Sequence, residues 1–135
     1  MYHKVIIIGN LGSDPQMRYT PEGIPVTTFS VATNRRWTNP DGSPGEETIW
    51  WRVTAWRKLA ETCNQFLSKG RQVYIEAQMR PDPHTGGPRI WTGNDGTARA
   101  SYEVTALTVK FLGARGEPVE APEEAAQGGE EEIPF

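Results

Sequence analysis

The chain has 135 residues, with 14 Lys and Arg, 17 Asp and Glu and a formal net charge of −3. This length suits one domain with a single hydrophobic core, and a single cysteine, Cys63, excludes an internal disulfide. The charge is uneven, because residues 1–112 carry 13 basic and 10 acidic side chains whereas residues 113–135 carry one Arg and seven Glu. The overall acidity therefore does not exclude a polyanionic partner for the mildly basic body.

The first half of the chain predicts three strands. An apolar run over residues 5–8 predicts a short strand, which ends at the glycine-containing residues 9–12. Alternation over residues 26–36 predicts a second strand. Residues 38–48 contain Asn-Pro-Asp-Gly and Pro-Gly, which predict a long hairpin loop before a third strand over residues 48–56.

The third predicted strand has two dissimilar faces. The core-like face holds Ile49, Trp51, Val53 and Ala55. The opposite face holds Thr48, Trp50, Arg52, Thr54 and Trp56. Polar strand faces rarely bury an indole, so we expect Trp51 to pack on the core and the other two tryptophans to be exposed.

One helix follows the third strand. Helical spacing is shown by Leu59, Cys63, Phe66 and Leu67. Lys69 and Gly70 predict a basic last turn and a stop, although no Ser, Thr, Asp or Asn caps the start of the helix. We expect Cys63 to be a small buried side chain in a reducing compartment.

Two further strands, over residues 73–79 and 102–112, enclose a turn-rich excursion over residues 80–100. Five strands with one helix between the third and fourth is the order of an OB-fold. We therefore predict an all-β, five-stranded OB-fold barrel over residues 1–112. The Glu-, Ala-, Pro- and Gly-rich residues 113–135 predict a flexible, disordered acidic tail.

The sequence offers no catalytic constellation. His3 and His84 are isolated, and no Cys or His cluster has the spacing of metal ligands. Asp14 and Glu22 are explained by solvated loops rather than as paired carboxylates. We expect no enzyme activity, no metal and no cofactor. The apolar run at residues 5–8 is too short for an export or membrane segment, so we expect a cytoplasmic protein without a membrane partner.

Four of the five tryptophans lie beside loops or basic residues, namely Trp37, Trp50, Trp56 and Trp91. Single-stranded nucleic acid exposes base faces and phosphates, so its binders combine flat aromatic side chains with cations. A core role is the alternative for each indole, and we favour that role only for Trp51. The pattern predicts a stacking surface for a single strand.

Several motifs together resemble the bacterial single-stranded DNA-binding protein (SSB) family. They are Val-Ile-Ile-Ile-Gly-Asn-Leu-Gly-Ser-Asp-Pro from residue 5, Trp-Trp-Arg-Val from residue 50, Lys-Leu-Ala-Glu from residue 58 and Lys-Gly-Arg-Gln-Val-Tyr-Ile-Glu from residue 69. The resemblance spans residues 3–112. It implies sequence-independent binding of single-stranded DNA in replication, recombination and repair, near the nucleoid, by a homotetramer.

The resemblance, together with the stacking pattern, gives an expected DNA site. Its residues are Trp37, Trp50, Trp56, Trp91, Arg35, Arg36, Arg52, Lys58, Lys69, Arg80 and Arg89. The expected subunit interface holds Trp51, Gln72, Tyr74 and Glu76. The family's acidic tip, which recruits partner proteins, is matched by Glu130, Glu131, Glu132, Ile133, Pro134 and Phe135.

Three features depart from the family pattern. Trp51 stands where a histidine near a subunit interface is usual, and residues 81–88 resemble an insertion before Trp91. The tail of 23 residues is also shorter than the family's long linker. Two alternatives are a carbohydrate-binding OB module, disfavoured by the Arg and Lys beside the tryptophans, and a replication-restart or RNA-chaperone OB protein, which would lack the terminal Ile-Pro-Phe.

Overall fold

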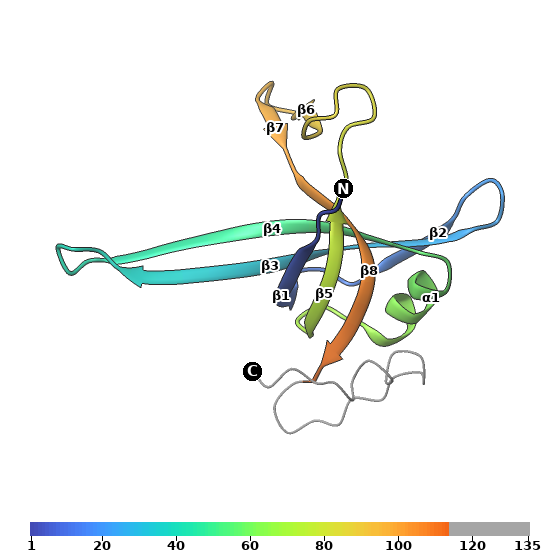
Figure 1. The fold of residues 1–135 in the computed structure, drawn as a ribbon, viewed down its shortest axis with the longest axis horizontal. Coiled ribbons are helices and arrows are strands. Elements are labelled where there is room, and N and C mark those ends of the chain that lie inside the picture. The colour runs from blue at the N-terminus through green and yellow to red at the C-terminus, as the bar shows by residue number, and fades with distance from the viewer. Residues whose placement is uncertain (114–135) are drawn as a thin grey trace.

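The computed structural model describes residues 1–113, so the predicted tail from residue 114 onward, with its acidic tip, lies outside the described residues. The elements in chain order are β1 (Val5–Leu11), β2 (Gln16–Tyr19), β3 (Pro25–Thr38), β4 (Pro44–Trp56), α1 (Arg57–Phe66), β5 (Gln72–Met79), β6 (Ile90–Thr92), β7 (Ala98–Ala100) and β8 (Tyr102–Leu112). Figure 1 shows the β3–β4 hairpin as a long arm and the β6–β7 hairpin as a separate projection.

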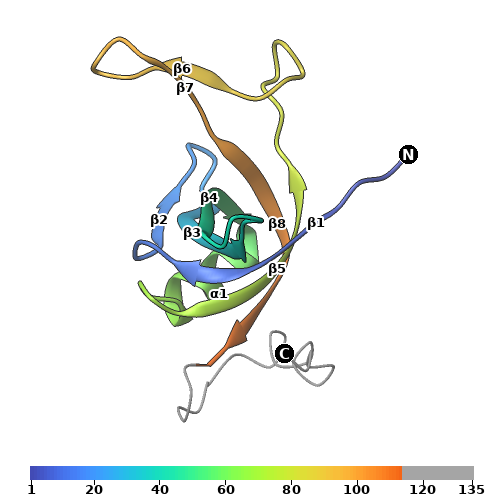
Figure 2. The ribbon, with the colours of Figure 1, turned by 90° about the vertical axis from the view of Figure 1, so that its left-hand side faces the viewer.

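Five of these strands close into a barrel (Figure 2). The strand order is β1-β5-β8-β4-β3, and β1 pairs back onto β3 at Asn10–Ala32 and Leu11–Val31. All neighbours are antiparallel except β4 and β8, which run parallel. The prediction of a five-stranded OB-fold barrel with one helix is confirmed.

The barrel is filled by the inward faces of its strands. Ile7, Val31, Val53, Val73, Ile75 and Val104 are each at most 1% exposed. Trp51 packs against this core, as predicted, and its Nε1 donates to Thr33 Oγ1 at 3.0 Å. The indole nitrogen of this partly buried side chain thereby keeps a hydrogen-bond partner.

The helix α1 packs against β3 and begins without a side-chain cap, as expected from its sequence. Thr27 Oγ1 on β3 donates to the Ala60 carbonyl at 2.7 Å, and Cys63 is fully buried. The prediction that Lys69 and Gly70 end the helix is wrong, because the helix ends at Phe66. Gly70 instead adopts φ 90° in the turn that leads into β5.

Two strand boundaries were also predicted wrongly. The first strand continues through residues 9–11, where the backbone pairs with β5 and β3. The predicted loop over residues 38–48 is mostly strand, and the connection between β3 and β4 spans only residues 39–43. Within it, the Asn39 N–H donates to the Ser43 carbonyl and Gly42 adopts φ 88°. One tight turn therefore suffices for the Pro- and Gly-containing segment.

Three short strands were not predicted from the sequence. The strand β2 pairs with β3 at the edge of the sheet, and β6 pairs with β7 inside the excursion over residues 80–100. All three are short, and none contributes to the buried core. They are too short to be predicted as strands from the pattern of apolar residues in the sequence.

Candidate nucleic-acid interface

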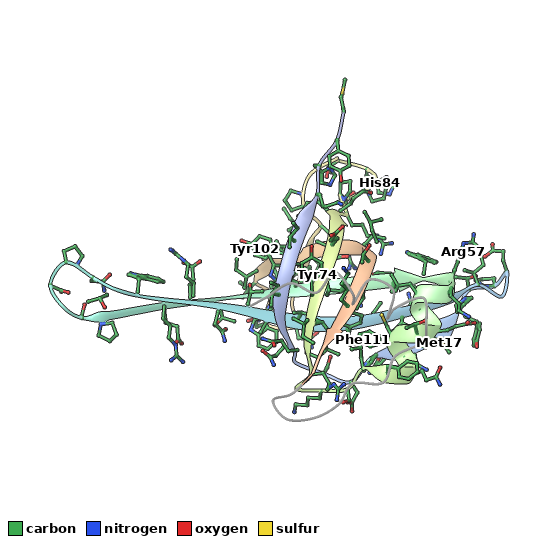
Figure 3. The ribbon with its side chains drawn as sticks, turned by 60° about the horizontal axis from the view of Figure 1, so that its bottom comes forward. Met17, Arg57, Tyr74, His84, Tyr102 and Phe111 are labelled. Carbon is green, nitrogen blue, oxygen red and sulfur yellow. The ribbon has the colours of Figure 1, made fainter. Side chains whose placement is uncertain are left out.

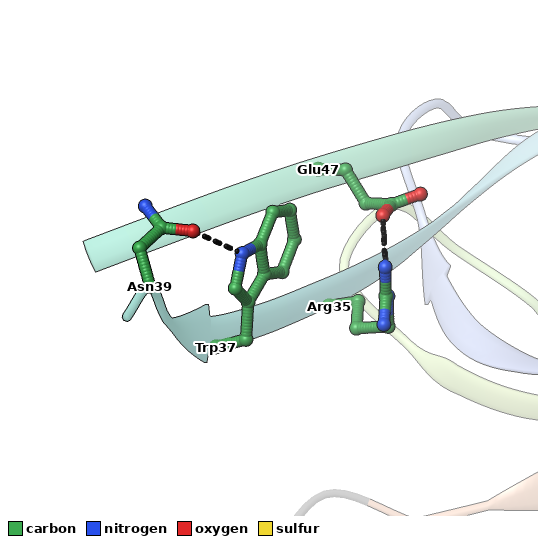
Figure 4. A network of polar contacts seen from close by, with 4 residues as sticks. All are labelled: Arg35, Trp37, Asn39 and Glu47. Atoms are coloured by element: carbon green, nitrogen blue, oxygen red, sulfur yellow. Dashed lines mark hydrogen bonds and ion pairs between the residues drawn. The ribbon is translucent and has the colours of Figure 1, made fainter. Parts of the chain in front are cut away.

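The β3–β4 arm carries Trp37 on an uninterrupted antiparallel ladder that runs from Val26–Trp56 to Thr38–Pro44. Trp37 lies opposite Gly45, where an added Cβ would come within 2.3 Å of the indole. The glycine therefore provides the space in which the ring lies across the facing strand. Trp37 Nε1 donates to Asn39 Oδ1 at 2.8 Å, which fixes the orientation of the indole (Figure 4).

Trp50 lies over a second glycine, nearer the barrel. A Cβ on Gly12 would come within 2.4 Å of the Trp50 ring, so the indole rests on the backbone after β1. This tryptophan is 55% exposed and borders a shallow cavity of about 350 Å³. Because the glycine supports one side of the ring, the exposed side is available for stacking.

A second cavity of about 320 Å³ lies next to Trp56, and we call it the arginine groove. Its basic residues are Arg18, Arg52, Arg80 and Arg89. It also contains the carboxylates of Asp82 and Glu103. Thr28 and Arg52 line both this groove and the cavity beside Trp50, so the two cavities are neighbours along β4. Four guanidinium groups against two carboxylates leave the groove attractive to phosphate.

The arginines of the site divide by their partners. Arg35 pairs with Glu47 and Arg36 pairs with Glu46, each at 2.7 Å across the arm. Arg89 contacts Glu103 at 3.3 Å. Within residues 1–113, no ion pair involves Arg18, Arg52 or Arg80. Arg18, Arg52 and Arg80 can therefore bind an anionic ligand without first breaking an ion pair to a carboxylate.

Trp91 lies on the β6–β7 hairpin, opposite Arg99 in the ladder. The Arg89 guanidinium lies 5.8 Å from the centre of its ring, and the Arg35 guanidinium lies 4.7 Å from that of Trp37. A cation over an indole face is stabilising by about 0.5–1 kcal/mol at exposed sites. Each of these indoles thus has an arginine beside it.

The structure brings some predicted residues together and separates others. Trp56, Arg52, Arg80 and Arg89 share the arginine groove, with Trp50 next to it. Trp37 and Trp91 lie on different projections of the chain (Figure 1). All four of these tryptophans are exposed, as expected.

The two predicted lysines line neither the arginine groove nor the cavity beside Trp50. Lys58 lies on α1, directly after Arg57, whose backbone φ of 59° is unusual for a residue other than glycine. The backbone N–H of Lys69 donates to Asp14 Oδ1 at 2.8 Å, and Asp14 borders the cavity beside Trp50.

Sequence reasoning missed Arg18. Its place in the groove depends on β2, whose residues Gln16–Tyr19 pair with β3 from Thr28 to Pro25. The alternation of Gln, Met, Arg and Tyr was the available signal. It is too short and too polar to predict a strand on its own.

Of the expected interface residues, Gln72, Tyr74 and Glu76 lie on the outer side of β5, where Tyr74 is labelled in Figure 3, whereas Trp51 lies on β4 and packs against the core. Tyr74 is only 7% exposed, and its hydroxyl donates to Glu76 at 2.8 Å. Lys4 Nζ donates to the other Glu76 oxygen at 2.8 Å. These two hydrogen bonds, that from Lys4 first, lower the pKa of Glu76, while the bond to Glu76 raises the pKa of Tyr74. The side chains thus form a polar network on this face.

Groups that could support catalysis are scarce in the described part of the chain. Residues 1–113 contain no group of three or more His, Cys, Asp and Glu side chains able to hold a metal ion. Burial raises the pKa of Cys63 to about 12, so its thiolate is strongly disfavoured. Across the same residues, no helix is long and apolar enough to cross a membrane.

This chain is similar in sequence to single-stranded DNA-binding proteins of two bacteria. The single-stranded DNA-binding protein of Neisseria meningitidis serogroup B is 43% identical over 115 residues, which cover 85% of this chain and 62% of the relative. That of Wolinella succinogenes is 36% identical over 131 residues, which cover 97% of this chain and 72% of the relative. The chain thus spans about 62% of the length of the Neisseria relative.

Solved structures share the fold. A deletion mutant of the single-stranded DNA binding protein from Thermus aquaticus is 26% identical with a TM-score of 0.64, over 84% of this chain and 52% of the other. The Plasmodium falciparum SSB complex with ssDNA is 24% identical with a TM-score of 0.67, over 83% of this chain and 96% of the other. The model of the single-strand binding protein family matches residues 2–112. The chain therefore belongs to the single-strand binding protein family.

Proposed function

We propose that this protein binds single-stranded DNA by stacking bases on Trp37, Trp50, Trp56 and Trp91, with little readout of sequence. The observation that carries the proposal is the combination of four exposed indoles with a groove of four arginines beside Trp56. The names of the curated relatives support the same ligand. A single strand presents both chemistries that this surface recognises, unstacked base faces and phosphates.

The arrangement favours single strands over duplex for a geometric reason. A base stacks on Trp37 or Trp50 only when its face is free, and a duplex buries those faces between neighbouring base pairs. The two glycines under these rings leave one side of each indole against the protein and the other side toward the ligand. Binding thus follows from base shape and backbone charge.

In the cell, we propose that the protein coats single strands during replication, recombination and repair, without an enzymatic step, in the cytoplasm near the nucleoid. Recruitment of partner proteins is assigned to the acidic residues 130–132 and the apolar residues 133–135. Acidic side chains would steer the tail toward a basic rim on the partner, and Phe135 would enter an apolar pocket there.

Assembly into a homotetramer is also proposed. In the described chain, the β1 edge that faces away from β5 pairs with β3 only at residues 10 and 11, so most of that edge is unpaired. Ile6 on this strand is 60% exposed. An unpaired edge with an exposed apolar side chain is suited to contact with a second copy of the chain. Gln72, Tyr74, Glu76 and Trp51 would support such contacts from neighbouring strands.

A fluorescence titration with oligo(dT), the matching duplex and an oligosaccharide tests the proposed ligand. Replacing each of the four exposed tryptophans with Ala should cost on the order of 1–3 kcal/mol of oligo(dT) binding for each stack removed. Phe66→Leu is the control, because Phe66 packs against Phe111 and lines neither the arginine groove nor the cavity beside Trp50. Equal affinity for duplex, or no effect of all four substitutions, would refute the proposal.

A further inference from the structure

A largely apolar pocket of about 420 Å³ lies under the loop over residues 80–88. Its apolar lining includes Met79, Pro81, Pro88, Ala100 and Tyr102. Ligand pockets usually have volumes of roughly 300–1,000 Å³ and combine an apolar lining with a few polar groups. The pocket is therefore large enough for a flat heterocycle.

The pocket is continuous with the arginine groove. Arg80, Pro81 and Glu103 line both cavities. A strand whose phosphates lie on the groove arginines would consequently have a base within reach of the pocket. Tyr102, which is 54% exposed, offers a ring on which that base can stack, and its own ring is held by Trp51 at a centroid distance of 5.5 Å.

Glu103 supplies the polar group. The residue is only 8% exposed, yet its side chain lines the pocket and the groove. One carboxylate oxygen accepts from Arg89 Nη1 at 3.3 Å, a long hydrogen bond. A carboxylate has about four acceptor sites and no donor, so most of its capacity remains for a ligand. The Arg89 contact also offsets the repulsion that a carboxylate would exert on nearby phosphates.

We propose that this pocket binds one nucleobase of the strand in the arginine groove, and that Glu103 favours bases with an exocyclic amino group. This inference rests on the proposed binding of single-stranded DNA. The N4 amino group of cytosine donates to a carboxylate, whereas thymine presents the acceptor O4 at the same position. A preference for cytosine at one base site is thereby added to a surface that otherwise reads no sequence.

The test compares oligo(dC) with oligo(dT) of equal length and uses the ratio of their affinities, for the wild type and for variants. Glu103→Gln keeps the shape of the side chain but both donates and accepts, so the preference should shift toward oligo(dT) by roughly tenfold, the value of one charge-assisted hydrogen bond. Any gain in phosphate binding by a released Arg89 acts on both oligonucleotides and cancels in the ratio.

A second variant tests the pocket itself. Ala100→Leu fills it and should remove the preference for oligo(dC), which moves the affinity ratio in the same direction as Glu103→Gln. Ala98→Leu is the matched control, because residue 98 lies on the same short strand but does not line the pocket. If both oligonucleotides bind and neither variant changes their ratio, the base pocket is refuted while the proposed function stands. If neither oligonucleotide binds, the proposed function fails as well.

Discussion

Removing one arginine from the groove should reduce the salt dependence of DNA binding more than removing one from the β3–β4 arm. Arg52 lines the groove and belongs to no ion pair within residues 1–113. Arg35, in contrast, is held by Glu47 at 2.7 Å (Figure 4). We therefore expect Arg52→Ala and Arg35→Ala to differ, although each removes one positive charge near a proposed stacking site.

The magnitude follows from counterion release. For single strands, log K decreases with log salt concentration, and the magnitude of this negative slope is smaller by about 0.7 for each phosphate that the protein no longer neutralises. Arg52→Ala should reduce the slope by about this amount. The Arg35–Glu47 pair is neutral as a unit, so a phosphate that displaces Glu47 exposes a carboxylate beside the DNA. Arg35→Ala should consequently change the slope by much less.

The small free energy of the Arg35–Glu47 ion pair does not make Arg35 a strong phosphate ligand. The side chains of Arg35 and Glu47 are 70% and 45% exposed, and exposed pairs contribute only about 0.2–1 kcal/mol. The pair can open at small cost, but the net charge near the strand stays zero. Replacing Glu47 with Gln removes the compensating negative charge. Glu47→Gln should therefore raise the affinity and increase the magnitude of the slope by about 0.7.

The measurement is a titration of tryptophan fluorescence with oligo(dT) of roughly eight nucleotides, within the site size of one OB fold. A short oligonucleotide keeps the slope from summing over several subunits. The wild type and the Arg52→Ala, Arg35→Ala and Glu47→Gln variants are titrated at several salt concentrations. An equal decrease of slope in both arginine variants, together with no gain in Glu47→Gln, would refute the division between groove and arm.

Three further outcomes are expected. Sedimentation should show a homotetramer for the wild type and smaller species for Ile6→Glu, whereas a monomeric wild type would contradict the proposed assembly. Deletion of residues 133–135 should abolish pull-down of DNA-processing proteins and leave oligo(dT) affinity equal or slightly higher, so that a clear loss of DNA affinity would refute the assigned role of the tail. Because Lys4 and the neighbouring tyrosine lower the pKa of Glu76, this carboxylate stabilises the fold above its ordinary pKa of 4.5, and the stabilisation is lost as the pH falls through the lowered value. Urea unfolding of Glu76→Gln should therefore show a smaller loss of stability on acidification than the wild type, and equal losses would contradict the role of this network.

Much of the barrel could be predicted because its strands bury one face. Val73, Ile75 and Ala77 alternate with polar side chains, and all three are fully buried. The same burial rule separated Trp51 from Trp50 on adjacent positions of β4. The strands β2, β6 and β7 could not be found in this way, since pairing with a neighbouring strand, rather than apolar burial, defines them.

The faces of the arm show why part of the site stayed hidden. Opposite residues of an antiparallel ladder share a face, so Trp37 and Arg35 lie on one face while Trp50, Arg52 and Trp56 alternate on the other. The sequence shows this alternation within each strand. Which face of the β3–β4 hairpin meets the arginine groove depends on the twist along this long hairpin and on where the barrel ends. Neither is encoded in a local pattern.

The error in the hairpin loop also hid the charge pairing. A five-residue connection over residues 39–43, with no bulge behind it, places Arg35 opposite Glu47 and Arg36 opposite Glu46. The predicted eleven-residue loop left these four side chains without cross-strand partners, so both arginines looked available for phosphate. Register is fixed by the turn, and charge compensation across strands is fixed by register. The length of one turn therefore determines which of the arginines predicted to bind DNA are paired with a carboxylate and which are not.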